Sequence, residues 1–390
     1  MRWEVKPLGE VCDVLDRMRK PITKKNRIAG PIPYYGATGI VDMVDGWLFD
    51  EPLVLLGEDG AKWGRGDRSA FLIEGKTWVN NHAHVLRTKV DVLDSWLIYS
   101  LNSRDLKGYV TGMTVPKLNQ ASMRTIPVPC PPIAEQERIV EVLDKAFSAI
   151  DKAKANIERN LINARELFQS RLNDIFSNPS EDWEVKPLGE VCGKIQDGAH
   201  HSPKQLFSEG GRGRYRYLTS KHIRPMELQW EGSQWCSQEF HETIWPRCNP
   251  ELGDVLLTKD GSNTGNVCLF SLEEPVSLLS SVCILKANRS IVRPEWILFF
   301  ILSPMGFKMV TGKMTGAAIR RIILKTIKAA EIAFPGLIEQ NDLIEMMFDL
   351  HASVVKVESH YQAELDNLEE LRQSILEQAF EGKLTEPFAA

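Results

Sequence analysis

Features that would assign the chain to a membrane, secreted or disulfide-bonded class are scarce. The longest strongly apolar run, Trp296 to Leu302, is far shorter than the roughly 20 residues that cross a bilayer. The first residues lack the apolar centre of a signal peptide. Seven cysteines, an odd number at scattered positions, predict free thiols in a reducing compartment. We therefore expect a cytoplasmic protein without membrane contact.

Motifs for catalysis and metal binding are also scarce. The chain has no Asn/Asp-Pro-Pro-aromatic sequence of an amino-methylating site. It also lacks the strand, glycine turn and helix of a nucleotide pocket. His82 with His84, or His200 with His201, could hold a metal, but no cysteine pair stands at zinc-ligand spacing. We expect no catalytic residue, no metal and no cofactor on this chain.

Charge is nearly balanced overall but unevenly distributed. The net charge is −5, and residues 336–390 hold 12 acidic and 3 basic side chains. Residues 1–132 hold 18 basic and 15 acidic side chains, and residues 181–335 hold 19 and 17. Slightly basic segments are compatible with phosphate contact. An acidic segment is more typical of a solvated or protein-docking face.

The chain does contain an internal repeat. Residues 3–12, Trp-Glu-Val-Lys-Pro-Leu-Gly-Glu-Val-Cys, recur unchanged at 183–192. Each copy opens a mixed block of short strands, turns and helix, and each block ends at a long helical pattern, over 133–176 and 337–380. Ten identical residues in a row indicate duplication, so we predict two related half-molecules in tandem.

The two long segments share the apolar spacing of helices that pack along another helix. Apolar residues recur in steps of four and three, and adding 204 to their numbers in the first segment gives apolar residues in the second. In both segments the alternation is broken at the same place by a second step of four in succession, which leads to Leu161 and to Leu365. We predict that the two helices pair along this seam: Ile139, Leu143, Ile150, Ile157, Leu161, Leu343, Met347, Leu350, Val354, Tyr361 and Leu365.

Polar and aromatic side chains near glycine turns are the candidates for nucleic-acid contact. Polar side chains read base edges, whereas Lys and Arg on phosphates position the protein without reading sequence. Packing or solvation is the commoner role for any single residue, so the prediction concerns the set. The first block offers Lys24, Lys25 and Arg27 for phosphate and Tyr34, Tyr35, Thr38, Lys62, Arg65, Asn81 and Thr114 for bases or stacking. The second offers Arg212, Arg214 and Arg216 for phosphate and His200, Lys221, Lys259, Ser262 and Asn263 for bases.

The whole pattern resembles the specificity subunit of a type I restriction-modification system. The resemblance rests on the two-block plan and on residues 131–139, Pro-Pro-Ile-Ala-Glu-Gln-Glu-Arg-Ile. Residues 336–340, Gly-Leu-Ile-Glu-Gln, form a second copy in which Gly336 replaces the second proline. The resemblance implies an α+β fold: two mixed α/β target recognition domains separated by two long helices in an antiparallel coiled coil, as a pseudo-twofold tandem repeat.

The resemblance also implies domain limits and a division of labour. The domains would be residues 1–132 and 179–335, the helices 133–178 and 336–382, and the tail 383–390. Each domain would read one half of a bipartite, asymmetric site in double-stranded DNA. The helices would set the spacing and dock two methylation subunits and, through them, restriction subunits. S-adenosylmethionine would bind the methylation subunit, and this chain would lack an active site.

Two other functions stay open on the residues alone. The chain could be a coiled-coil scaffold that assembles proteins without touching DNA. It could also be a self-contained modification-restriction enzyme, against which the missing methyl-donor motifs argue.

Overall fold

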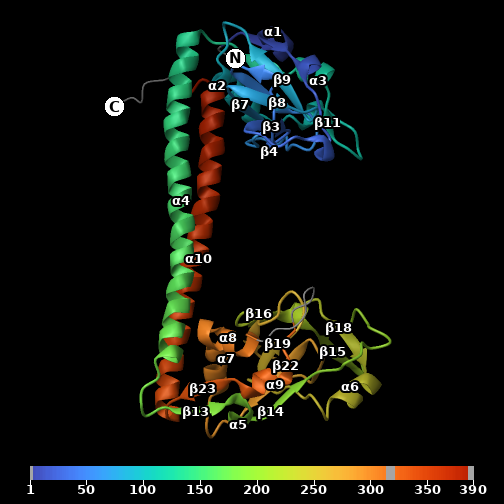
Figure 1. Ribbon diagram of the computed structural model, residues 1–390, viewed down its shortest axis with the longest axis vertical. Coiled ribbons are helices and arrows are strands. Elements are labelled where there is room, and N and C mark those ends of the chain that lie inside the picture. The colour runs from blue at the N-terminus through green and yellow to red at the C-terminus, as the bar shows by residue number, and fades with distance from the viewer. Residues whose placement is uncertain (1–2, 313–320, 385–390) are drawn as a thin grey trace. The chain divides into compact units, whose positions relative to one another are not determined.

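The computed structural model describes residues 3–312 and 321–384. The chain divides into two compact units (Figure 1). Unit 1 comprises Met1–Glu158 and Tyr361–Ala390, and unit 2 comprises Arg159–His360. Each unit therefore contains one of the two sequence blocks together with part of both long helices. The predicted tail, 383–390, lies outside the described residues from position 385 onward.

A sheet with the strand order β2-β9-β6-β7 forms the centre of unit 1. Its strands are β2 (Cys12–Val14), β6 (Leu53–Gly57), β7 (Ala70–Ile73) and β9 (Ala83–Thr88), all paired antiparallel. Every residue of β6 is buried, as its uninterrupted apolar sequence requires of a strand with neighbours on both sides. This sheet carries the first block's core.

A second sheet of unit 1 has the order β4-β3-β8-β5. It is formed by β3 (Ile32–Gly36), β4 (Gly39–Val44), β5 (Phe49–Asp50) and β8 (Lys76–Val79), with β3 and β8 parallel. The glycine-rich sequence from Ile32 to Gly39 is thus a strand followed by a tight turn. The remaining elements of this block are β1 (Val5–Pro7), α1 (Leu8–Val11), η1 (Asp16–Met18), η2 (Lys24–Asn26), α2 (Asp94–Asn102), η3 (Lys107–Tyr109), β10 (Val110–Thr111), β11 (Lys117–Leu118), α3 (Gln120–Arg124) and β12 (Pro127–Pro129).

Unit 2 repeats this topology. The order β14-β22-β19-β20 matches the first sheet of unit 1, and β18-β15-β21 contains one parallel pair, as the second does. The elements are β13 (Glu184–Pro187), α5 (Leu188–Val191), β14 (Cys192–Asp197), β15 (Arg214–Leu218), η4 (Ser220–His222), β16 (Ile223–Arg224), β17 (Glu227–Leu228), β18 (Gln234–Ser237), α6 (Gln238–Ile244), β19 (Val255–Thr258), β20 (Val267–Leu269), β21 (Val276–Leu278), β22 (Val282–Ala287), α7 (Pro294–Leu302), α8 (Pro304–Thr311), α9 (Leu324–Ala329) and β23 (Glu331–Phe334).

The two long helices are α4 (Ile133–Ser177) and α10 (Leu337–Phe380), within one residue of the predicted limits. In unit 1, Asp151 pairs with Arg372 at 2.7 Å and Lys154 with Glu369 at 2.5 Å. In unit 2, Arg165 pairs with Glu358 at 2.6 Å, and the Phe168 ring lies 5.3 Å from that of His351. Rising numbers on α4 meet falling numbers on α10, so the helices run antiparallel within each unit.

The residues of the predicted seam are all buried or half-buried. Ile139, Leu143 and Met347 are at most 1% exposed. They belong to the cores of their units rather than to an isolated helix contact. The spacing is less regular than the repeat suggests, because Val357, which corresponds to half-buried Ala153, is 38% exposed. Among the described residues, no helix is both long and apolar enough to cross a membrane.

A buried glutamine joins each long helix to its block. Gln136 is 0% exposed, and its Oε1 accepts from the Leu93 N–H at 3.0 Å. Its Nε2 donates to the carbonyls of Asp91 and Pro131 at 2.8 and 2.9 Å. One side chain therefore satisfies three backbone groups where the chain enters α4 and where α2 begins.

Gln340 makes the same three bonds in unit 2. It accepts from the Arg293 N–H at 2.8 Å and donates to Ile291 and Pro335 at 3.0 and 2.8 Å. The Glu-Gln pair of the repeated sequence thus has a structural reason, because its glutamine is the residue that connects helix and block. Gly336, which replaces a proline, leaves this joint unchanged.

We expect Gln136→Glu to lower the free energy of unfolding by about 2–4 kcal/mol, since a carboxylate cannot donate to the two buried carbonyls. The size of the side chain is preserved, so packing is not the cause. The midpoint of unfolding measured by calorimetry checks this. Glu137→Gln, at an exposed neighbouring position, serves as the control, and equal midpoints for both variants would contradict the joint.

Candidate nucleic-acid interface

A basic segment of unit 1 lies against the hairpin formed by β3 and β4. The Arg27 guanidinium is 2.8 Å from Asp42 of β4 and 4.5 Å from the centre of the Tyr34 ring in β3. The Tyr34 hydroxyl accepts from the Ile22 N–H at 2.9 Å. These contacts fix the segment that carries Lys24 and Lys25, both exposed in η2. Two ammonium groups are thereby presented to solvent from an ordered support.

The other candidates of unit 1 differ in accessibility. Tyr34 is 1% exposed and is therefore a packing residue, not a surface for base stacking. Tyr35 is half-buried, with its ring 6.1 Å from that of Phe71. Arg65 is exposed but forms an ion pair with Glu377 of α10, so it connects the block to the helix. The remaining candidates are exposed: Thr38, Lys62, Asn81 and Thr114.

In unit 2, Arg216 is held between two tryptophans. Its guanidinium lies 4.7 Å from the Trp230 ring and 4.4 Å from the Trp235 ring, and its Nε is 2.6 Å from Glu274. Such stacking together with an ion pair occupies the group within the unit. Arg214 is similarly placed 3.9 Å from the Phe207 ring. Arg216 is thus a structural residue.

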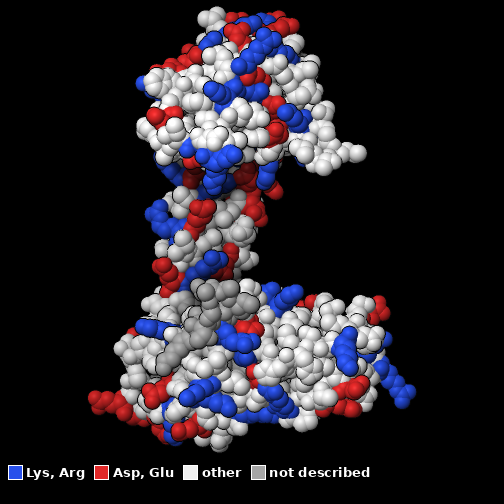
Figure 2. All heavy atoms as spheres, turned by 45° about the vertical axis from the view of Figure 1, so that its right-hand side comes forward, with Lys and Arg blue, Asp and Glu red and all other residues white. Residues whose placement is uncertain are grey.

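The remaining candidates of unit 2 lie on several elements. Lys259 is 5% exposed and bound to Asp197 at 3.2 Å, so it is not accessible to DNA. Asn263 is half-buried and donates to the Ser220 carbonyl at 3.1 Å. His200 is exposed, with Nε2 2.7 Å from Arg247. Arg212, Lys221 and Ser262 are exposed. On the face that Figure 2 shows, basic side chains are interspersed with acidic ones.

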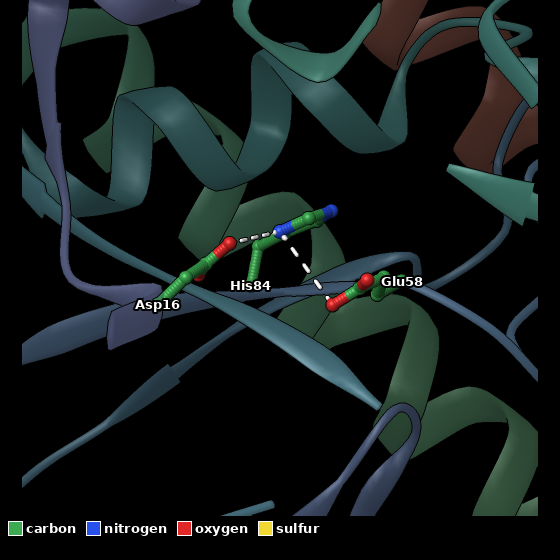
Figure 3. A group of neighbouring side chains, drawn as sticks. All are labelled: Asp16, Glu58 and His84. Atoms are coloured by element: carbon green, nitrogen blue, oxygen red, sulfur yellow. Dashed lines mark hydrogen bonds and ion pairs between the residues drawn. The ribbon is translucent and has the colours of Figure 1, made fainter. Parts of the chain in front are cut away.

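A charged cluster that the sequence did not predict lies at one end of the central sheet of unit 1. Asp16, Glu58 and His84 each offer one ligand atom, and these atoms lie within 4.8 Å of one another (Figure 3). His84 Nδ1 is 2.6 Å from Asp16, and Nε2 is 2.7 Å from the Leu118 carbonyl. Both ring nitrogens therefore face acceptors.

The two carboxylates of the cluster already have cationic partners. Glu58 is 2.5 Å from Arg19 and 2.9 Å from Lys117, and Arg19 is 3.4 Å from Asp16. A metal ion at these atoms would compete with both cations and would need a lone pair on a His84 nitrogen. The geometry therefore favours a network of buried ion pairs, and the absence of a metal on this chain stays a prediction.

The network controls how these carboxyls titrate. Burial raises the pKa of Asp16, but the hydrogen bond and charge of His84, the Val85 N–H and Arg19 outweigh it, so the pKa lies below its ordinary value of 3.8. Burial likewise raises the pKa of Glu58, and Lys117 and Arg19 reverse the effect to below 4.5. Both groups are consequently held as anions.

Unit 2 has a related cluster at the corresponding end of its sheet. Asp197 lies 3.2 Å from Lys259 and 2.5 Å from Arg247. Burial raises the Asp197 pKa, but Lys259 and then Arg247 bring it below 3.8. Lys259 occupies the position of Glu58 in the repeated fold. The Glu58 carbonyl accepts a hydrogen bond from the Leu118 N–H at 2.8 Å, and the Lys259 carbonyl accepts one from the Ile322 N–H at 2.7 Å. The charge at this position is therefore reversed between the two domains.

A sequence signal for both clusters was present. A similar four-residue turn follows the buried apolar strand in each block: Gly-Glu-Asp-Gly at 57–60 and Thr-Lys-Asp-Gly at 258–261. Alignment of the two turns would have paired Glu58 with Lys259. The acidic partners Asp16 and Asp197 lie far from these turns in the sequence, in η1 and at the end of β14, and no local pattern connects them.

We expect stability to fall in acid because of these groups. Their folded-state pKa values are depressed, so their contribution is complete above the ordinary carboxyl pKa and is lost as pH falls through the depressed values. Asp16→Asn should cost about 3–5 kcal/mol at neutral pH, because it breaks a buried ion pair, and should flatten the dependence of the unfolding midpoint below about pH 4. The exposed Asp50→Asn serves as control; an unchanged acid slope for Asp16→Asn would contradict the assignment.

Comparisons with known proteins match the chain to one family. The family model described as "Type I restriction modification DNA specificity domain" matches residues 1–159. A putative type I restriction enzyme specificity subunit of Haemophilus influenzae is 26% identical over 349 residues, covering 88% of this chain and 86% of that protein. The type I restriction enzyme EcoKI specificity subunit of Escherichia coli K12 is 25% identical, over 75% of this chain and 65% of that protein.

Solved structures share the fold. A chain from a structure of a type I R-M system aligns over 98% of both chains with a TM-score of 0.73 and 18% identity. The HsdS subunit from Thermoanaerobacter tengcongensis aligns over 98% of this chain and 97% of its own, with a TM-score of 0.54 and 17% identity. Residues 1–159 carry the type I restriction-modification DNA specificity domain, and along most of its length the chain is similar to type I restriction enzyme specificity subunits, which supports a DNA-recognition subunit.

Proposed function

We propose that each target recognition domain reads one half of a bipartite, asymmetric DNA site. The support is that the central sheets of the two blocks have the same strand order. Their exposed candidate groups differ, with Thr38 and Asn81 in the first block and Arg212 and Ser262 in the second. Two domains with one scaffold and unlike surfaces are suited to two different half-sites. The single observation that carries this proposal is the repeated topology with unlike loops.

The long helices are proposed to set the spacing between the half-sites. Helix α4 has 45 residues, which at about 1.5 Å per residue gives a length of about 68 Å. At about 3.4 Å per base pair this limits the centre-to-centre distance to roughly 20 base pairs. The domain boundaries at 132/133, 178/179 and 335/336 belong to this proposal, since the ordered helices begin and end within two residues of them.

The helices are also proposed to dock the catalytic partners. Helix α10 and the residues after it carry most of the acidic excess, with 12 acidic and 3 basic side chains over 336–390. Two methylation subunits would bind here and bring restriction subunits with them. S-adenosylmethionine would be bound by the methylation subunits, and this chain would contribute recognition without an active site, in the cytoplasm. A protein-only scaffold or a self-contained enzyme is not favoured by the family match.

The test is selection of duplexes from a randomised library by the complex of this chain with its methylation subunits. We expect a two-part motif with a gap of fixed length, and methylated adenines mapped within that motif. A complex lacking this chain is the control and should select nothing. Equal binding or methylation of all duplexes would end the proposal.

We expect Lys24→Gln together with Lys25→Gln to weaken DNA binding by the complex about equally for all sequences. The two ammonium groups would contact phosphates, so the slope of log affinity against log salt should become shallower by about 0.9 per lost contact. Titration at several salt concentrations measures this. Lys145→Gln, on the exposed side of α4, is the matched control, and a slope unchanged in the double variant would remove the segment from the interface.

A further inference from the structure

The hairpin of β3 and β4 exposes an apolar surface that its own unit does not cover. Ile40, Val41 and Met43 are 58%, 51% and 44% exposed. They stand on β4, the outermost strand in the order β4-β3-β8-β5. Apolar residues gathered on an outer strand favour aggregation unless something covers them. The three residues, which we call the β4 strip, therefore need an occupant.

An irregularity in the hairpin explains why three of four successive side chains are exposed. Tyr34 pairs with Asp42 and Tyr35 with Ile40, so Val41 has no opposite residue. An extra residue of this kind shifts the alternation of side chains along the strand. Asp42 turns to Arg27, whereas Ile40, Val41 and Met43 remain exposed. The local structure thus presents the strip to solvent.

The surroundings of the β4 strip are cationic. Residues 17–27 contain six basic side chains. Arg19 pairs with Glu58 and Arg27 with Asp42, whereas Arg17, Lys20, Lys24 and Lys25 are exposed. This segment is attached to the hairpin by the Arg27–Asp42 ion pair and by the bond from the Asp45 N–H to the Ile28 carbonyl at 2.9 Å. An apolar strip beside several cations suits a polyanion with apolar groups in its groove. It suits an acidic protein less well, because a protein interface would need a broader apolar area.

The major groove of DNA fits both features. It admits a two-stranded β-ribbon, and the only apolar group on its floor is the 5-methyl of thymine. Lysines on the flank would meet phosphates while the strand lies in the groove. A hairpin whose outer strand exposes aliphatic side chains is therefore suited to contact methyl groups rather than the hydrogen-bonding groups of the bases.

We propose that the β4 strip reads thymine 5-methyl groups in the half-site recognised by the first domain. Ile40 and Val41 would contact the methyl groups directly, and Met43, further along β4, would extend the same apolar contact. The inference deepens the proposed function and rests on it. It assigns part of the sequence specificity to apolar residues, whereas the polar candidates Thr38 and Asn81 would read other positions.

The experiment compares two randomised duplex libraries, one made with thymidine and one with 2′-deoxyuridine, which lacks only the methyl group. The full complex with the methylation subunits selects from each. We expect one half of the motif to contain thymine in the first library and to lose about fourfold in enrichment per contacted methyl in the second. The other half should change less. Because the unaltered protein is used, misfolding cannot produce this result.

Variants then assign the effect to the strip. Ile40→Ser with Val41→Ser should bind the thymidine and deoxyuridine forms of the selected site equally. Leu72→Ser, at a 40% exposed position on the outer strand of the other sheet, should keep the full difference. Both positions are on the surface, and the unfolding midpoint of each variant verifies its fold.

The outcomes separate the inference from the function on which it rests. A two-part motif with no thymine in either strand of the affected half, or with equal selection from both libraries, overturns the β4 strip and leaves DNA recognition intact. Loss of assembly with the methylation subunits in the Ile40/Val41 variant also overturns it, because the strip would then be a protein contact. Absence of any motif overturns the proposed function itself.

Discussion

The interaction on which the rest of each unit depends is the buried amide at the start of a long helix. Gln136 and Gln340 each accept one backbone N–H and donate to two carbonyls. Water cannot satisfy these groups, because both side chains are 0% exposed. The indoles of Trp96 and Trp296 add a bond each to the strand that precedes the helix. These bonds fix the direction in which each helix leaves its own block.

That constraint lets the two domains diverge without losing the scaffold. The strands are paired through the backbone, and backbone bonds do not depend on side-chain identity. The position after the buried central strand can therefore be Glu58 in one domain and Lys259 in the other, each neutralised by its own partners. Between residues 195 and 245 the sequences differ while the parallel pair of β15 and β21 reproduces that of β3 and β8. Both units therefore keep the same strand pairing while their side chains differ.

The accessible groups fall into different physical classes. Lys24 and Lys25 are charges suited to phosphates, Thr38 and Asn81 are polar groups suited to base edges, and the β4 strip is apolar. Arginine is used differently, since Arg27 and Arg216 stack on aromatic rings and pair with carboxylates inside their units. A cation with two such partners orders the surface around it. In the proposed recognition of DNA, the accessible side chains would depend on others that make their contacts within the same unit.

The sequence alone indicated the tandem repeat and the limits of both long helices, and its resemblance to a known family implied their antiparallel pairing. The repeat and the helix limits follow from repeated residues and apolar spacing, which can be recognised in the sequence itself. Only the tertiary structure decided which candidates are accessible: Tyr34 and Lys259 are buried, and Arg65 is paired with α10. Only it brought together Asp16, Glu58 and His84, from three separate parts of the chain. Exposure and long-range pairing depend on how distant strands meet, and no single stretch of sequence records that.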